Sequence, residues 1–231
     1  MGLIACPVKG KQKSADICAA FVAGAPRSTF GFVFYGVDDS NLRDWRIARN
    51  SGEPWWYIDN SYFDKVRGKQ FRVTRDALQL RNARYVISTG DRFDRLELRV
   101  QPWQHNPAGH WLVCPQSDSF MHTIAQAPDW FKQVTPAEGE VRVRPWLRDK
   151  LKRQATLVED LQGARCLITH TSAAAVGALL EGIPAFVSEQ SAVSGVKFGS
   201  DRYPVFHALA DAQFTLNEMK QGLAWAMLNR K

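Results

Sequence analysis

The sequence of 231 residues contains few cysteines and no long apolar run. A membrane-spanning helix needs about 20 predominantly apolar residues, and no run of even about eighteen exists here, so we expect no membrane span. The cysteines form no CxxC pair and no Cys/His pattern typical of zinc; they are Cys6, Cys18, Cys114 and Cys166. We therefore expect a cytoplasmic protein without disulfides or structural zinc.

Several motifs of common enzyme classes are also missing. No GxxxxGK[ST] is present, which argues against P-loop ATPases and kinases, and no GxGxxG follows a strand, which argues against dinucleotide oxidoreductases. GxSxG, HExxH and DxD are absent as well, and the five histidines form no local ligand pair. Asp38 and Asp39 are adjacent, but a loop turn explains them as well as a metal does. We expect no metal and no cofactor.

Positive charge is in excess. The formal net charge is +7 and the isoelectric point is about 9.4. Such a balance favours an anionic partner, which would be nucleic acid, a phosphorylated small molecule or a charged polymer. A solvated basic surface with no particular partner explains the charge equally well.

Short apolar runs alternate with amphipathic stretches, as in STFGFVFYGV (28–37) followed by SNLRDWRIARNSG (40–52). This alternation predicts an α/β fold with largely parallel sheets. The stretch RVQPWQHNPAGH (99–110) has the Pro, Asn and Gly content of a connector. We expect two α/β domains, residues 1–105 and 106–231. The last 21 residues predict one long helix, with a capping box at Thr215 and Glu218.

The stretch HTSAAAVGALLEGIP (170–184) follows the apolar run RCLITH (165–170). We predict a parallel strand that ends here and a helix capped by Thr171 and Ser172. The first N–H groups of such a helix are free and carry about half a positive charge, which suits phosphate. The alternative is an ordinary cap followed by small residues that pack closely.

The run THTSAAAVGALLEGIPAFV (169–187) resembles the donor-binding region of GT-B glycosyltransferases, in particular the capsular-polysaccharide type. VRVRPWLRDK (141–150) and LVEDLQGA (157–164) are similar to the basic strand and following helix of the same family. VFYGV, WWYIDNSYF, FRVTRDALQ, DRFDRL and LVCPQSD extend the resemblance to small phage and bacterial glycosyltransferase-like proteins.

The resemblance implies two Rossmann-like domains with parallel sheets and a cleft between them. Residues 1–105 would form the acceptor side and residues 106–231 the nucleotide-sugar donor side. Many members hold the nucleotide ribose with a Glu at the position that Gly177 occupies here, which leaves the donor's identity open.

Candidate donor-binding residues lie around the same stretch. We expect Arg142, Arg144 and Lys150 to clamp a diphosphate together with His170, Thr171 and Ser172, although a solvated basic strand edge is the alternative. By resemblance, Ser117 and Asp118 would join them from the end of a neighbouring strand. Asp201 and Arg202 resemble a family loop that closes over the donor.

The catalytic base must come from the first half under this reading. Sugar transfer needs a group that accepts the proton of the acceptor hydroxyl. Asp59, at the end of a strand among aromatic residues, is the first candidate and Asp38 the second. A turn-capping role is the alternative for Asp59.

The function expected from these features is metal-independent transfer of a sugar from a nucleotide-sugar donor to an acceptor hydroxyl. Basic charge and the phage-like pattern favour a hydroxymethylated pyrimidine in phage DNA as acceptor, with the target base flipped or otherwise presented. A capsule or surface glycan is the alternative acceptor. A non-catalytic phage protein that binds nucleic acid on a transferase fold is the alternative class.

Overall fold

The computed structural model describes residues 2–81, 83, 88–145 and 155–228. The chain forms two compact units. Unit 1 comprises Met1–Arg81, Ile87–Phe93 and Phe206–Lys231, and unit 2 comprises Asn82–Val86 and Asp94–Val205. This division differs from the single boundary expected at 105/106, because the chain returns to unit 1 at its C-terminal end. In the described part of the chain, no helix has both the length and the apolar character needed to cross a membrane.

Unit 1 is built on a five-stranded sheet of order β1-β2-β3-β4-β9. The first three strands are parallel, whereas β4 runs antiparallel to β3 and β9 antiparallel to β4. The expected parallel pattern therefore holds for only part of this sheet. A ten-residue connection containing the short 3-10 turn η1 (Asp64–Val66) joins β3 to β4, and a parallel crossover needs a dozen or more residues. The strands are β1 (Leu3–Ala5), β2 (Gly31–Tyr35), β3 (Trp55–Asn60), β4 (Phe71–Arg75) and β9 (Gln213–Phe214).

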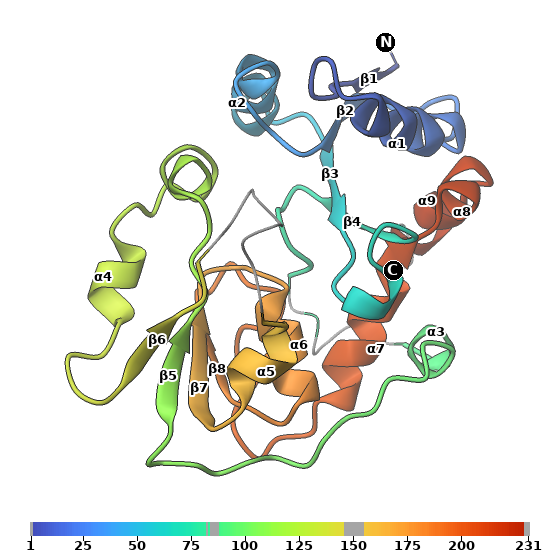
Figure 1. The fold of residues 1–231 in the computed structure, drawn as a ribbon. Helices are drawn as coiled ribbons and strands as arrows, with labels where there is room; N and C mark the ends of the chain where they lie inside the picture. Colours follow the sequence, from blue (N-terminus) through green and yellow to red (C-terminus); the bar gives the residue numbers. More distant parts are fainter. Residues whose placement is uncertain (1, 82, 84–87, 146–154, 229–231) are drawn as a thin grey trace. The chain divides into compact units, whose positions relative to one another are not determined.

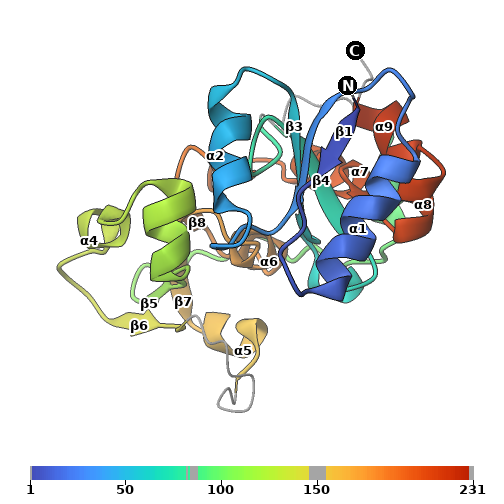
Figure 2. The ribbon, with the colours of Figure 1, turned by 90° about the horizontal axis from the view of Figure 1, so that it is seen from above.

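Helices cover both faces of this sheet. Figure 2 shows α2 on one side of the strands and α1, α8 and α9 on the other. The second group encloses a core in which Phe21, Trp56 and Trp225 pack ring against ring. The helices are α1 (Gln12–Ala23), α2 (Leu42–Asn50), α3 (Asp91–Asp94), α7 (Tyr203–Asp211), α8 (Leu216–Lys220) and α9 (Leu223–Leu228).

The C-terminal segment confirms one prediction and corrects another. Thr215 Oγ1 accepts from the Glu218 backbone N at 3.2 Å and Glu218 accepts from the Thr215 N at 2.7 Å, so the capping box is present. One long helix is wrong, since β9 precedes α8 and Gly222, at φ 80°, separates α8 from α9. The end of α1 packs closely against α8 at Gly24. A Cβ at this position would lie 1.9 Å from the Met219 carbonyl oxygen, so only glycine fits there.

Unit 2 contains an entirely parallel four-stranded sheet of order β6-β5-β7-β8, which confirms the expected α/β architecture with parallel strands. In Figure 1, α5 and α6 lie on one side of this sheet, and the connection through η3 and α4 lies on the other. The strands are β5 (His110–Val113), β6 (Val141–Val143), β7 (Ala164–Thr169) and β8 (Ala185–Val187); the helices are the π-helical η3 (Phe120–Ala125), α4 (Trp130–Val134), α5 (Leu157–Leu161) and α6 (Ala174–Leu180).

Candidate functional site

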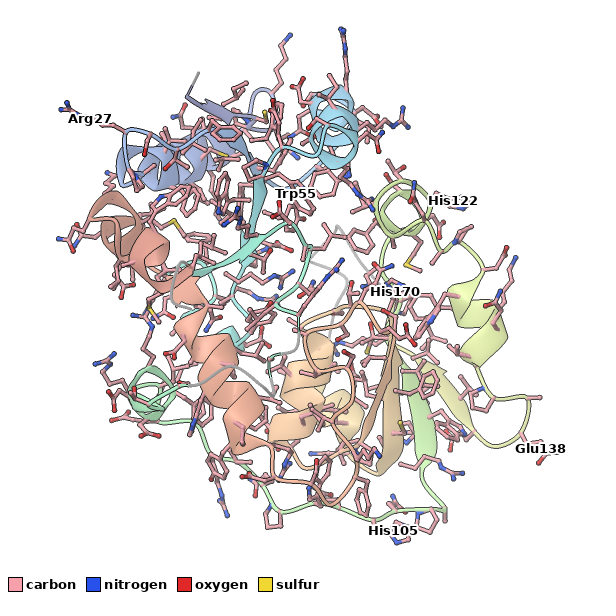
Figure 3. The ribbon with its side chains drawn as sticks, turned by 180° about the vertical axis from the view of Figure 1, so that it is seen from behind. Arg27, Trp55, His105, His122, Glu138 and His170 are labelled. Carbon is pink, nitrogen blue, oxygen red and sulfur yellow. The ribbon has the colours of Figure 1, made fainter. Side chains whose placement is uncertain are left out.

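The strand order of unit 2 reverses between β5 and β7. From β5 the chain crosses to β6 on one side, and the next strand, β7, lies on the other side. Ligands of open parallel sheets bind beyond the carboxyl ends of the strands at such a switch point. Thr169 Oγ1 donates to the Cys114 carbonyl oxygen at 2.7 Å and joins the two strand ends. Figure 3 shows His170 at this edge and Glu138 and His105 at the opposite end of the sheet.

The turn between β7 and α6 differs from the predicted phosphate cradle. The side-chain amide of Gln116 lies against it. With the amide oxygen turned toward the two backbone N–H groups, which is the orientation that satisfies both ends of the amide, it accepts from Thr171 N and Oγ1, both at 2.8 Å, and from Ser172 N at 3.1 Å. Ser172 Oγ in turn accepts from the Ala174 N at 3.2 Å. The N–H groups of Thr171, Ser172 and Ala174 are therefore bound within the protein. The N-cap of α6 is Ala173, without a side-chain cap, so the expected cap by Thr171 and Ser172 is wrong, and phosphate binding at this turn stays a prediction.

His170 is the polar residue of this edge whose hydrogen bonding is incomplete. It is 2% exposed, and its Nδ1 is buried without a hydrogen-bond partner among the described residues. Burial lowers the pKa of the imidazole, so the ring is neutral at pH 7. An unpartnered buried polar atom costs about 1–3 kcal/mol, and such atoms in a native fold call for an explanation. His170 can therefore offer a hydrogen bond that no group in the described part of the chain takes.

Two aromatic residues that the sequence did not single out lie beside His170. The ring of Trp130 meets the His170 ring edge to face, with centroids 5.2 Å apart, and stacks on Phe186 at 6.2 Å and an interplanar angle of 28°. Phe186 pairs with Ile168 across the sheet, so the two side chains lie on the same face. His170 follows Ile168 by two residues and therefore lies on that face as well. It is 51% exposed. The sequence pattern did not predict the exposure of Phe186, because an apolar residue in a strand is expected to be buried.

The two arginines in and directly after β6 do not form a free clamp. The Arg144 guanidinium forms an ion pair with Asp160 and donates to the Thr156 carbonyl oxygen at 3.0 Å, which ties it to the start of α5. Arg142 pairs with Glu140 at 2.7 Å, and both side chains are more than half exposed. Lys150 lies outside the described residues. Both arginines of the predicted diphosphate clamp therefore already have an acidic partner within the protein.

The strand end after β5 brings Ser117 and Asp118 to the same edge as His170. Ser117 Oγ accepts from the N–H of Phe120, the first residue of η3, at 3.2 Å. Asp118 is exposed. Their place at the carboxyl edge agrees with the predicted strand, and their donor-binding role stays a prediction.

Asp201 and Arg202 lie elsewhere in the fold. Arg202 is buried, donates to the carbonyl oxygens of Leu179 and Gln101, and its guanidinium lies 4.2 Å from the centroid of the Trp103 ring. Leu179 belongs to the last turn of α6, at the end of the helix that is farther from the carboxyl edge of the sheet. Asp201 accepts from the Tyr203 N at 3.0 Å. The pair closes the far end of α6, so the expectation of a loop over the donor is not retained.

In unit 1, Asp59 is the second-to-last residue of β3 and is bound to a buried arginine. Asp59 Oδ2 lies 2.5 Å from an Arg72 guanidinium nitrogen, and the side chains are 29% and 7% exposed. Asp59 Oδ1 also accepts from the Asn60 N at 2.7 Å. Antiparallel pairing of β3 with β4 sets Asp59 opposite Arg72. Sequence reasoning missed Arg72, since it assigned no antiparallel partner to β3.

Asp38 organises the turn before α2. Its Oδ1 accepts from Ser40 Oγ at 2.6 Å and from Ser40 N at 3.0 Å, and Lys11 lies 3.6 Å away. The hydrogen bond from the Ser40 hydroxyl is the main cause that lowers the pKa of Asp38. The turn-capping role considered for Asp59 is therefore observed at Asp38.

No family model and no curated protein matches the chain. Solved structures that are similar to it include two transferases. One is the Thermosulfurimonas dismutans KpsC beta Kdo 2,4 transferase, with 10% identity over 99% of this chain and 98% of that chain and a TM-score of 0.49. The other is the KpsC beta Kdo 2,7 transferase of the same organism, with 14% identity over 95% and 90% and a TM-score of 0.46. Likeness at this level does not define a function.

Proposed function

We propose that the protein is a glycosyltransferase that binds the nucleotide part of a sugar donor at the carboxyl edge of unit 2. The observation that carries the proposal is the buried, unpartnered Nδ1 of His170 at the switch point between β5 and β7. Ligands of parallel sheets bind there, and a neutral imidazole suits a phosphate or sugar oxygen as a hydrogen-bond donor. The resemblance of residues 169–187 to GT-B donor regions favours a nucleotide sugar as the ligand.

Asp59 is the proposed proton acceptor in unit 1. In the transfer, the acceptor hydroxyl gives its proton to the carboxylate and its oxygen bonds to the anomeric carbon. The bond from that carbon to the donor phosphate breaks, and the electron pair leaves with the nucleotide. The ion pair with Arg72 fixes the position of the Asp59 carboxylate. Neither a metal nor a cofactor is part of this proposal.

The proposed acceptor is DNA that carries hydroxymethylated pyrimidines. Unit 1 supports an anionic acceptor, since its sequence contains 17 Lys and Arg against 11 Asp and Glu, whereas unit 2 contains 13 against 12. A capsule or surface glycan is the second acceptor class. Mass spectrometry after incubation with a bound donor separates them. A gain of one sugar on hydroxymethylated DNA supports the first, and unchanged DNA with a modified glycan supports the second.

A second function is favoured by a specific observation in unit 2. Both features expected to hold phosphate are satisfied internally, because Gln116 binds the Thr171 and Ser172 N–H groups and Arg144 pairs with Asp160. A protein that binds nucleic acid without catalysis on a transferase fold would have this arrangement. It predicts salt-dependent DNA binding with no nucleotide binding.

A thermal-shift panel of nucleotide sugars tests the proposal. A ligand at 100 times its Kd stabilises the folded state by about 2.7 kcal/mol, so one nucleotide should raise Tm by several degrees. We expect His170→Gln to lose this shift. His122→Gln, at an exposed histidine of η3, is the matched control and should retain it. No shift with any nucleotide sugar, together with DNA binding, would establish the second function instead.

A further inference from the structure

Phe186 has an aromatic face that no described ring of unit 2 covers. One side of its ring stacks on Trp130, at 6.2 Å and 28°. Phe186 is nevertheless 51% exposed, so about half of its surface is open to a ligand. A phenylalanine held in a strand and backed by a nearly parallel indole is a rigid, flat surface.

This surface is continuous with the proposed donor site. Ser188, two residues after Phe186, donates to the His170 carbonyl oxygen through its N at 3.1 Å and its Oγ at 3.0 Å. Trp130 contacts both Phe186 and His170. The open ring and the unpartnered Nδ1 therefore belong to one short stretch of the same sheet face.

We infer that Phe186, backed by Trp130, is the stacking platform for the nucleobase of the donor. This inference rests on the proposed function and specifies which part of the ligand this surface binds. Every nucleobase has a flat π-face, and aromatic side chains bind it with little dependence on sequence. Gly177 stands where the resemblance implies a Glu that holds the ribose. Stacking of the base on Phe186 needs no polar partner and so does not depend on that Glu.

The chain provides a closely matched control. Phe198, also in unit 2, is 50% exposed and lies against another indole, that of Trp103, at 5.3 Å. Trp103 is also the ring over which Arg202 lies, at the far end of α6. Phe198→Ala removes the same exposed ring as Phe186→Ala, at a place remote from His170.

The experiment compares a nucleoside monophosphate with ribose 5-phosphate, which has the same sugar and phosphate and no base. Binding is measured by calorimetry for the wild type and for variants at Phe186 and Phe198. Phe186→Ala should weaken the mononucleotide about 5- to 100-fold, the range that loss of one base–aromatic stack produces. It should leave ribose 5-phosphate unchanged. Phe198→Ala should change neither, and Phe186→Tyr should restore mononucleotide binding, whereas Phe186→Leu should not.

The outcomes separate the two proposals. If the wild type binds the mononucleotide and Phe186→Ala binds it equally well, the platform is refuted while the donor site stands. Equal weakening of the mononucleotide and ribose 5-phosphate also refutes stacking, because the base is then not what Phe186 contacts. If the wild type binds no nucleotide at all, the proposed function fails and the platform with it.

Discussion

The strand ends of the two units differ in how completely their polar groups are bound. In unit 1, both carboxylates expected to be functional have protein partners, since Asp38 binds Ser40 and Lys11 and Asp59 binds Arg72. In unit 2, His170 keeps a buried nitrogen without a partner, beside a half-exposed phenylalanine. A polar group that the protein satisfies serves stability first, whereas one left unsatisfied retains its full capacity for a ligand. Among the described residues, unit 1 also has buried nitrogens without a partner, Arg72 Nε and Gln213 Nε2, so the two units differ in their candidate residues and ligand recognition in unit 2 stays a proposal.

The largest expected effect on the unfolding free energy comes from removing one partner of the Asp59–Arg72 ion pair in unit 1. Asp59→Ala leaves the buried Arg72 guanidinium without its counter-charge, which should cost about 3–5 kcal/mol of unfolding free energy. Arg72→Met should cost less, because the Asp59 side chain is 29% exposed and can be hydrated. Urea unfolding at pH 7 measures both. The double variant should recover part of the loss, and single variants as stable as the wild type would show that the pair contributes nothing.

A smaller effect separates the two arginines of the β6 region. Arg144→Met removes a 13%-exposed ion-pair partner that also binds the Thr156 carbonyl, and we expect a loss of about 1–3 kcal/mol. Arg142→Met removes an exposed pair and should leave the unfolding free energy unchanged. Urea titrations of the two variants provide the comparison. Equal stability of both, with lost nucleotide binding in each, would restore the diphosphate clamp that the sequence predicted.

The smallest expected effect is the pH dependence of stability that the buried His170 of unit 2 causes. Burial lowers the pKa of His170 in the folded protein, so the unfolded chain binds its proton more readily. The contribution of the neutral ring is present above pH 6.5 and is lost as the pH falls through the unfolded value of about 6.5. The wild type should therefore lose stability between pH 7.5 and 5 faster than His170→Gln, by at most about 1.4 kcal/mol per pH unit.

Unfolding free energies at several pH values test this difference. His110 also has a pKa lowered by burial, with nearby Arg142 as a second cause, but it is present in both proteins and cancels. A His170→Gln variant whose pH dependence equals that of the wild type would mean that the buried ring does not titrate below its ordinary range.

Local signals in the sequence were reliable because they involve neighbouring residues. The Thr215–Glu218 capping box formed as predicted, and a second box at Thr156 and Glu159 follows the same rule. Alternating apolar and amphipathic stretches indicated parallel α/β structure, which unit 2 shows throughout. Topology alone also brought Ser117 and His170 to one edge of the sheet.

Long-range pairing could not be predicted in this way. Arg72 meets Asp59 only because β4 runs antiparallel to β3, and β9 joins the same sheet from residue 213 onward. Gln116 reaches Thr171 across 55 residues. Arg202 closes α6 because the loop before α7 lies at the helix's far end. Each contact depends on which strands are neighbours, which is decided by how the apolar faces pack and not by the residues involved.

By itself, the sequence determined the alternation of strands and helices, the helix caps and the basic charge, because these depend on local periodicity, nearby hydrogen bonds and composition. Tertiary structure alone decided which polar groups are satisfied. It assigned partners to Thr171, Arg144 and Asp59 and left His170 Nδ1 without one. A hydrogen bond or ion pair between distant residues exists only once strand order and register have brought them within a few ångströms.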